Sequence, residues 1–222
     1  MYLKYFDAIH TSNDSLTSKV TKHNPHAFTL CSGVDFDWYT PHPQPEGFCI
    51  GWAGDTAKNM KNTELINGLM TPTRWATKDN YIPNHEMPER FYRKINALVH
   101  PSSHEGSCRV ITEAAACGLP IICTDVGHNS TIVDPAWMIT LDNNPKAQIT
   151  RLLNKLKTDP TLAQHIGQQN QKQAKNYAWP RVIERANHII NTIMGVKDAR
   201  EVIQEGYTPS VTTPSTTITM KA

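Results

Sequence analysis

The sequence predicts an α/β fold, a Rossmann-like parallel sheet with helices on both faces. From Gly47 onward, short apolar runs alternate with segments of helical periodicity, which is the pattern of repeated strand and helix units. Residues 97–101 and 120–125 are mostly apolar, as strands covered on both faces are. Gly118 and Pro120 end the helix that is expected between these two runs.

The elements are expected in a regular order along the chain. Residues 6–12 alternate weakly and are followed by a helical stretch, so a strand and then a helix are expected there. A short strand near 27–35 ends in a glycine turn, and the proline-rich segment 38–47 marks a loop or linker. The alternating strand and helix segments that follow are 48–54, 62–70, 74–78, 88–95, 97–102, 109–118, 120–125 and 137–140.

The C-terminal third is expected to be helical. Asp159 is placed to cap a helix with Pro160 at its first position, and another helix is expected to open at Pro180. The apolar residues of this last helix fall on one stripe, which predicts that the helix docks on another surface. From about Tyr207 the chain has too little apolar surface to offset its ordering entropy, so it is expected to be unstructured. The stripe consists of Val182, Ile183, Ala186, Ile189, Ile190, Ile193 and Met194.

The length of 222 residues allows one good hydrophobic core, so one domain with appendages is expected. Residues 1–32 would hold a strand, a helix and a linker. Residues 33–195 would form the main domain with its C-terminal helices. Residues 196–222 would be a tail.

The composition excludes several partners and compartments. With 22 basic and 20 acidic residues the net charge is +2, which gives no electrostatic reason to expect nucleic acid or an anionic membrane as the main partner. None of the five cysteines forms a CxxC pair, which suits reduced thiols. No signal peptide is apparent, and no apolar run approaches the roughly 20 residues of a membrane span. A soluble, cytoplasmic protein is expected.

A ligand site is expected beyond the C-terminal ends of the strands, where open parallel sheets bind their ligands. Three such ends, 51–55, 101–107 and 125–129, are rich in Gly, Ser, His or charge, and the second leads into a helix beginning near Arg109. A helix N-terminus presents unpaired N–H groups and about half a positive charge, which suits a diphosphate. Because Arg109 is a cation at the end of a helix that favours anions, it is expected to face one.

Glu105 and Glu113 lie eight positions apart, one in the loop and one about a turn inside the helix. Two acceptor-only groups spaced in this way can hold the vicinal hydroxyls of a ribose or a hexose. For Glu113, compensation of the helix dipole is an equally good explanation. For Glu105, in a Ser/His/Gly loop at a strand end, a functional role is favoured.

These residues also carry a family resemblance. Residues 100–128, HPSSHEGSCRVITEAAACGLPIICTDVGH, resemble the signature of retaining GT-B glycosyltransferases of the glycosyl transferases group 1 type, in which two glutamates are separated by seven residues. Segments 32–35, 87–102 and 176–190 are similar to three further segments of that family. The resemblance spans about residues 5–194 and implies one half of a GT-B fold, the C-terminal donor-binding domain. Residues 1–32 would then be a remnant of the family's N-terminal domain.

The resemblance implies a role for each matching residue. Glu113 would bind the ribose of a nucleotide, and Glu105, as the catalytic residue, would bind the donor sugar near its reacting carbon. Residues 51–62 resemble a glycine-rich loop that carries an Arg and a Lys against the diphosphate, but Asp55 stands about where that Arg is expected. Lys58 or Lys61 is then the candidate for the basic residue that contacts the diphosphate. For either lysine, a solvated side chain without a ligand is at least as strongly expected. The further donor-binding residues are Gly54, His104, Gly106, Ser107, Cys108, Arg109 and Gly127.

The sequence departs from the family's pattern at two further positions: His128 replaces a Gly and Thr131 replaces a Glu of the turn that follows residues 120–125. Both departures bear on how the nucleotide would be oriented. His100 and His104 lie near a strand end, where either a donor contact or a structural role is expected. No HxxxH or HxH spacing is present, so no metal is expected. No cofactor is expected either.

The resulting functional prediction is a glycosyltransferase that moves a sugar from a nucleotide-diphosphate-sugar donor to an acceptor, with retention. The acceptor is a glycan, a lipid or another molecule, and a partner chain or a second copy could supply its site. Two alternatives stay open. One is a non-catalytic nucleotide-sugar-binding subunit that needs a partner chain, and the other is a GT-B-type epimerase or phosphorylase.

Overall fold

A five-stranded parallel sheet forms the centre of residues 33–178 in the computed structural model of the chain, which describes residues 2–195. Its strands run in the order β4-β3-β5-β6-β7. Every residue of β3, β5 and β6 is buried, as expected of strands covered on both faces. The strands are β3 (Ile50–Ala53), β4 (Thr73–Ala76), β5 (Ala97–His100), β6 (Ile121–Thr124) and β7 (Met138–Ile139).

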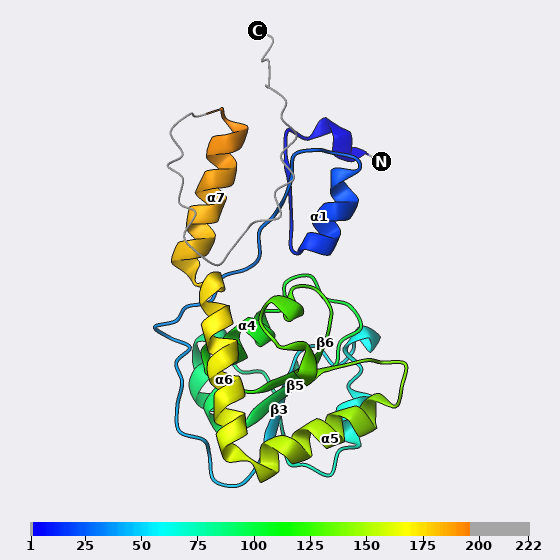
Figure 1. Cartoon of the computed structure of the whole chain (residues 1–222), viewed down its shortest axis with the longest axis vertical. Coiled ribbons are helices and arrows are strands. Elements are labelled where there is room, and N and C mark those ends of the chain that lie inside the picture. Colours follow the sequence, from blue (N-terminus) through cyan, green and yellow to red (C-terminus); the bar gives the residue numbers. More distant parts are fainter. Residues whose placement is uncertain (1, 196–222) are drawn as a thin grey trace. The chain divides into compact units, whose positions relative to one another are not determined.

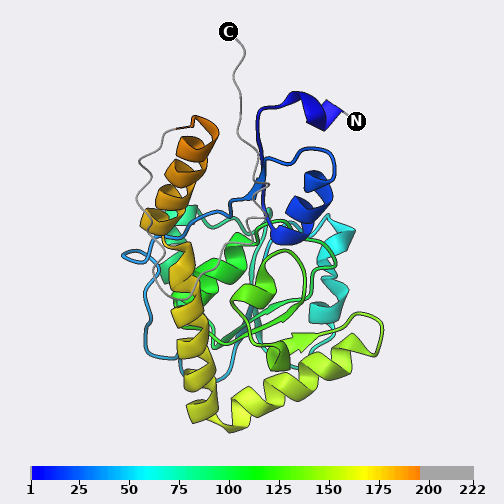
Figure 2. The ribbon, with the colours of Figure 1, turned by 45° about the horizontal axis from the view of Figure 1, so that its top comes forward.

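Helices flank this sheet (Figure 1). Helix α4 (Arg109–Ala116) connects β5 to β6, while α5 (Pro145–Thr158) packs on β7 and α6 (Pro160–Ala174) packs on α4. Figure 2 shows that α5 and α6 meet at a sharp corner. The shorter helices are α2 (Glu64–Asn67) and α3 (Met87–Arg90). The predicted α/β, Rossmann-like fold class is confirmed.

Local signals placed several helix ends correctly. The side chain of Asp159 accepts a hydrogen bond from the Leu162 N–H at 2.9 Å and caps α6, with Pro160 as its first residue. The segment expected to be helical at 88–95 is instead interrupted at Phe91, between α3 and a 3₁₀ turn at Tyr92–Lys94.

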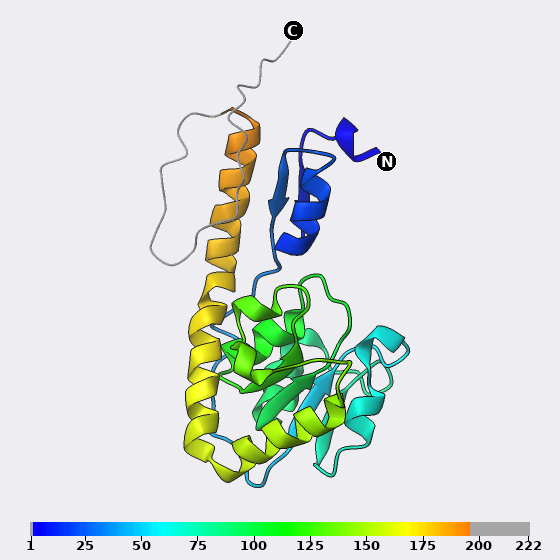
Figure 3. The same ribbon diagram turned by 45° about the vertical axis from the view of Figure 1, so that its right-hand side comes forward.

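The chain divides into two compact units, and the smaller one consists of residues up to Ser32 together with residues from Trp179. In it, β1 (Ile9–Thr11) and β2 (Ala27–Thr29) pair in parallel and are connected by α1 (Asp14–Thr21), which packs on both (Figure 3). Helix α7 (Trp179–Ile193) belongs to the same unit. The boundaries predicted at residues 32 and 195 stay predictions.

The predicted tail at residues 196–222, including the disorder expected from about 207, lies outside the described residues. Within residues 2–195 no helix combines the length and the apolar character needed to cross a membrane.

The strand order places the reversal of the sheet at β3. The chain continues from β3 to β4 on one side and then returns to β5 on the other side. At such a switch point the loops beyond the carboxyl ends of the two strands lead away from each other and leave a crevice for a ligand. The segments that matter are therefore the loops that follow β3 and β5.

Candidate functional site

Several hydrogen bonds join the loops after β3 and β5. The Asn62 side-chain amide donates to the Pro101 carbonyl at 2.7 Å, and the Ser103 N–H donates to the Met60 carbonyl at 2.7 Å. These bonds hold the two loops side by side, so their side chains meet at the carboxyl edge of the sheet.

Glu105, in the loop after β5, meets a cation from the loop after β3. Lys61 Nζ donates to Glu105 Oε1 at 2.5 Å, and His100 Nε2 lies 2.9 Å from the same oxygen. Burial raises the pKa of the Glu105 carboxyl, but hydrogen bonds from His100 and Lys61 outweigh burial and bring the pKa to about 2. Glu105 is therefore ionised at neutral pH and can accept hydrogen bonds from hydroxyl groups.

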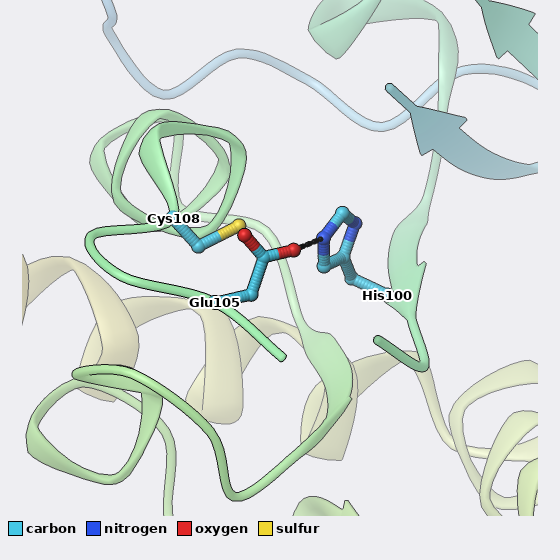
Figure 4. Close-up of side chains that lie close together, drawn as sticks. All are labelled: His100, Glu105 and Cys108. Atoms are coloured by element: carbon cyan, nitrogen blue, oxygen red, sulfur yellow. Dashed lines mark hydrogen bonds and ion pairs between the residues drawn. The ribbon is translucent and has the colours of Figure 1, made fainter. Parts of the chain in front are cut away.

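His100, the last residue of β5, has no exposed surface. Its ring stacks on Trp52 of β3, with centroids 6.3 Å apart, and Ser102 Oγ lies 3.0 Å from its Nε2. Burial lowers the pKa of His100, but the neighbouring Cys108 and Glu105 raise it to about 9. Figure 4 shows the Glu105 carboxylate between the imidazole and the Cys108 sulfur.

Glu113 lies in the second turn of α4, and its side chain is buried. Its Oε2 accepts a hydrogen bond from the Tyr92 hydroxyl at 2.7 Å, and its Oε1 accepts one from Arg109 at 3.1 Å. Arg109 also donates to Asn84 Oδ1 at 2.8 Å. Burial raises the pKa of Glu113, while the hydrogen bonds from Tyr92 and Arg109 act against that rise.

The N-terminus of α4 is partly occupied by a histidine. The Cys108 N–H donates to His128 Nδ1 at 3.3 Å, and His128 Nε2 lies 3.0 Å from Thr112 Oγ1. Burial lowers the pKa of His128 to about 4, so the ring is neutral at neutral pH and accepts at Nδ1. The Cys108 amide, predicted to receive a diphosphate, therefore already has a partner.

Two glycines shape the loops. Gly127 has φ +65°, and a Cβ there would lie 2.5 Å from the Gly106 carbonyl oxygen, so the turn after β6 can approach the Glu105 loop only without a side chain. Gly54 has φ +153°, and a Cβ there would lie 3.0 Å from the Trp52 ring.

The structure brings Lys61, Cys108 and Gly127 close to Glu105, but it separates the two lysines and the two histidines. Lys61 contacts Glu105, whereas the Lys58 side chain is exposed. His100 contacts Glu105, whereas His104 is exposed and pairs with Ser103 Oγ at 3.0 Å. Arg109 does face an anion, and that anion is Glu113.

Sequence reasoning missed two polar residues near Glu113, Tyr92, which donates to Glu113, and Asn84, which accepts from Arg109. Tyr92 lies in segment 87–102, which resembles a family segment, but neither residue follows a strand end. The one available signal was that a tyrosine within a buried segment needs a hydrogen-bond partner for its hydroxyl.

Part of the chain matches a known protein family. Residues 79–173 match the family of glycosyl transferases group 1. The chain is 28% identical over 129 residues to the O-antigen chain mannosyltransferase B of Escherichia coli, covering 58% of this chain and 32% of that protein. It is 25% identical over 159 residues to a D-inositol 3-phosphate glycosyltransferase of Thermomonospora curvata, covering 70% of this chain and 36% of that protein. The chain thus spans about a third of the length of these relatives.

Solved structures agree on the fold. The sucrose-phosphate synthase of Thermosynechococcus elongatus matches with a TM-score of 0.72 at 12% identity, over 87% of this chain and 60% of that one. Anabaena Alr3699/HepE, in complex with UDP and glucose, matches with a TM-score of 0.70 at 13% identity, over 88% of this chain and 65% of that one. Residues 79–173 are thus similar to the glycosyl transferases group 1 family, and the chain shares its Rossmann-like fold with these solved structures.

Proposed function

We propose that this domain binds a nucleotide-diphosphate sugar and transfers the sugar to an acceptor with retention at the anomeric carbon. The observation that carries the proposal is the ion pair between Glu105 and Lys61 at the switch point of the sheet. It places an ionised acceptor and a cation together beside the N-terminus of α4, which is where a sugar and a diphosphate would need them.

Each carboxylate has a proposed role. Glu105, kept ionised by His100 and Lys61, would accept hydrogen bonds from the donor sugar near its reacting carbon. Lys61 and the α4 N-terminus would balance the charge that develops on the leaving diphosphate. Glu113, whose oxygens already accept from Tyr92 and Arg109, would use its remaining acceptor capacity for the ribose hydroxyls.

The named relatives support a hexosyl donor. One is a mannosyltransferase, others are D-inositol 3-phosphate glycosyltransferases, and one structural neighbour was crystallised with UDP-glucose. The transferase is proposed to need no metal for the transfer step, because a lysine and a helix N-terminus supply the positive charge. The acceptor is left open.

Thermal-shift measurement with UDP-, GDP- and ADP-sugars tests donor binding. A donor at about 100 times its Kd should stabilise the native protein by about 2.7 kcal/mol. The shift should occur with one nucleotide class and disappear in Glu113→Ala. It should persist in Glu64→Ala, a matched change at an exposed position of α2.

Transfer assays then separate the proposal from its rivals. Product that keeps the donor's anomeric configuration in NMR supports a retaining transferase. If the donor binds but is neither transferred nor hydrolysed, the protein is a binding subunit. An isomerised nucleotide sugar supports an epimerase. Absence of a shift with every nucleotide sugar contradicts the donor site itself.

A further inference from the structure

Three side chains of different chemistry converge beside Lys61. His100 at the end of β5, Glu105 in the following loop and Cys108 at the N-cap of α4 each offer one ligand atom, and these atoms lie within 4.8 Å of one another. His100 and Cys108 are buried, with exposures of 0% and 4%. Figure 4 shows that one carboxylate oxygen faces the imidazole while the other lies beside the sulfur.

The ligand set favours a borderline-soft divalent cation. Bonds of about 2.0–2.3 Å to N, O and S ligands in a tetrahedron put neighbouring ligand atoms about 3.3–3.8 Å apart. Ligand atoms that now lie up to 4.8 Å apart would need to approach by about 1–1.5 Å, whereas His100 Nε2 and Glu105 Oε1, at 2.9 Å, would need to separate slightly. Thiolate and imidazole ligands select Zn²⁺, whereas Mg²⁺, Ca²⁺ and Mn²⁺ prefer oxygen alone. Three protein ligands leave the fourth position of Zn²⁺ to water.

We propose that His100, Glu105 and Cys108 form a Zn²⁺ site whose occupation competes with the nucleotide-sugar donor. The competition, but not the metal site, rests on the proposed function. When the Zn–N and Zn–S bonds form, the proton on the ligating nitrogen of His100 and the thiol proton of Cys108 leave to water, and no electron is transferred. Lys61 donates to Glu105 Oε1 at 2.5 Å, so a metal bound at that oxygen would displace its ammonium group.

Competition follows from the position of Glu105. A lone pair of its carboxylate that binds Zn²⁺ no longer accepts a hydrogen bond from the donor sugar, so the metal and the sugar compete for the same oxygens. The cation would also repel the displaced Lys61 from the place where the diphosphate is proposed to bind. Zn²⁺ would thus act as an inhibitor and take no part in the transfer step.

Cobalt spectroscopy on the full 222-residue chain tests the metal site without any donor. Co²⁺ substitutes for Zn²⁺, and a cysteine thiolate bound to it gives a charge-transfer band in the near ultraviolet. We expect a band that saturates at one Co²⁺ per chain, disappears when Zn²⁺ is added and is unaffected by Mg²⁺. Cys108→Ser should abolish the band, and His100→Asn should weaken Co²⁺ binding.

Cys49→Ser is the matched control, because Cys49 is a half-buried thiol outside this group, and this variant should keep the band. Circular dichroism and melting curves establish that each variant is folded. A band that survives in Cys108→Ser, or no band in the folded wild type, overturns the metal site.

Donor titrations with and without Zn²⁺ test the competition. With free Zn²⁺ at about ten times its own Kd, the apparent Kd of the donor should rise about tenfold in the wild type. It should rise less than about twofold in Cys108→Ser. An equal rise in both proteins contradicts the competition. If no nucleotide sugar binds to any variant, the proposed function fails, and the cobalt band alone decides the metal site.

Discussion

Glu105 and Glu113 are the same residue type, eight positions apart, yet their surroundings differ in almost every respect. Glu105 lies in a loop between a lysine and a histidine, and its pKa is lowered to about 2. Glu113 lies inside a helix between a tyrosine hydroxyl and an arginine, and burial raises its pKa. The comparison teaches that sequence spacing locates such a pair, whereas the neighbouring elements decide how each carboxylate behaves.

The difference arises from the source of the partners. Glu105 receives a cation from the loop after β3, which the sheet order brings next to the loop after β5. Glu113 receives the Tyr92 hydroxyl from the segment before β5 and a cation from its own helix, at Arg109. The contacts of Glu105 with Lys61 are therefore tertiary, whereas one of the contacts of Glu113 comes from its own helix.

The largest effect is expected at Gly127, which packs against the loop of Glu105. In Gly127→Ala the Cβ would meet the Gly106 carbonyl oxygen in a left-handed backbone, so we expect about 2–5 kcal/mol less stability in urea unfolding. Gly47 has φ +76° with open space around it, so Gly47→Ala should cost only about 1–2 kcal/mol. Equal losses in the two variants would show that the close approach to the Glu105 loop is unimportant.

The pH dependence of stability should have opposite signs at the two glutamates. Because the folded pKa of Glu105 lies below its ordinary value, this carboxylate stabilises the protein above about pH 4.5, and the contribution is lost as the pH falls towards 2. Glu105→Gln should therefore cost about 1–2 kcal/mol at pH 7, after allowance for solvent screening, and less at pH 3.

Because the folded pKa of Glu113 is raised, its charged form is penalised in the folded protein, and its contribution falls as the pH rises through that pKa. The free energy of unfolding of Glu113→Gln should thus increase relative to that of the wild type as the pH rises. The exposed Glu46 supplies the control, since Glu46→Gln should change stability by less than about 0.5 kcal/mol at either pH. If the stability difference from the wild type changed with pH in the same direction in both Gln variants, the proposed difference between the two glutamates would be contradicted.

The smallest expected effect separates the two lysines. Lys61→Met removes the cation beside Glu105 and should weaken binding of the nucleotide-sugar donor about tenfold in calorimetry. Lys58→Met, at an exposed position, should weaken it less than about twofold. A larger loss of donor affinity in Lys58→Met than in Lys61→Met would mean that Lys58 contacts the donor. Lys61 would then be only a structural partner of Glu105.

Much of the fold could be predicted from local signals in the sequence. The apolar runs that became β5 and β6, the cap at Asp159 and the end of α4 before Gly118 all depend on residues close together in the chain. The break between α3 and the next turn was not predicted, because Phe91 and Tyr92 are both fully buried in contacts that no local pattern reveals.

By itself, the sequence determined the fold class, the three strand ends worth attention and the pair of glutamates, because periodicity and turn residues act over a few positions. Only the tertiary structure placed Lys61 rather than Lys58, and His100 rather than His104, in contact with Glu105. It also placed His128 on the Cys108 amide and brought His100, Glu105 and Cys108 together. These outcomes depend on contacts between separate loops, which follow from the order of the strands in the sheet.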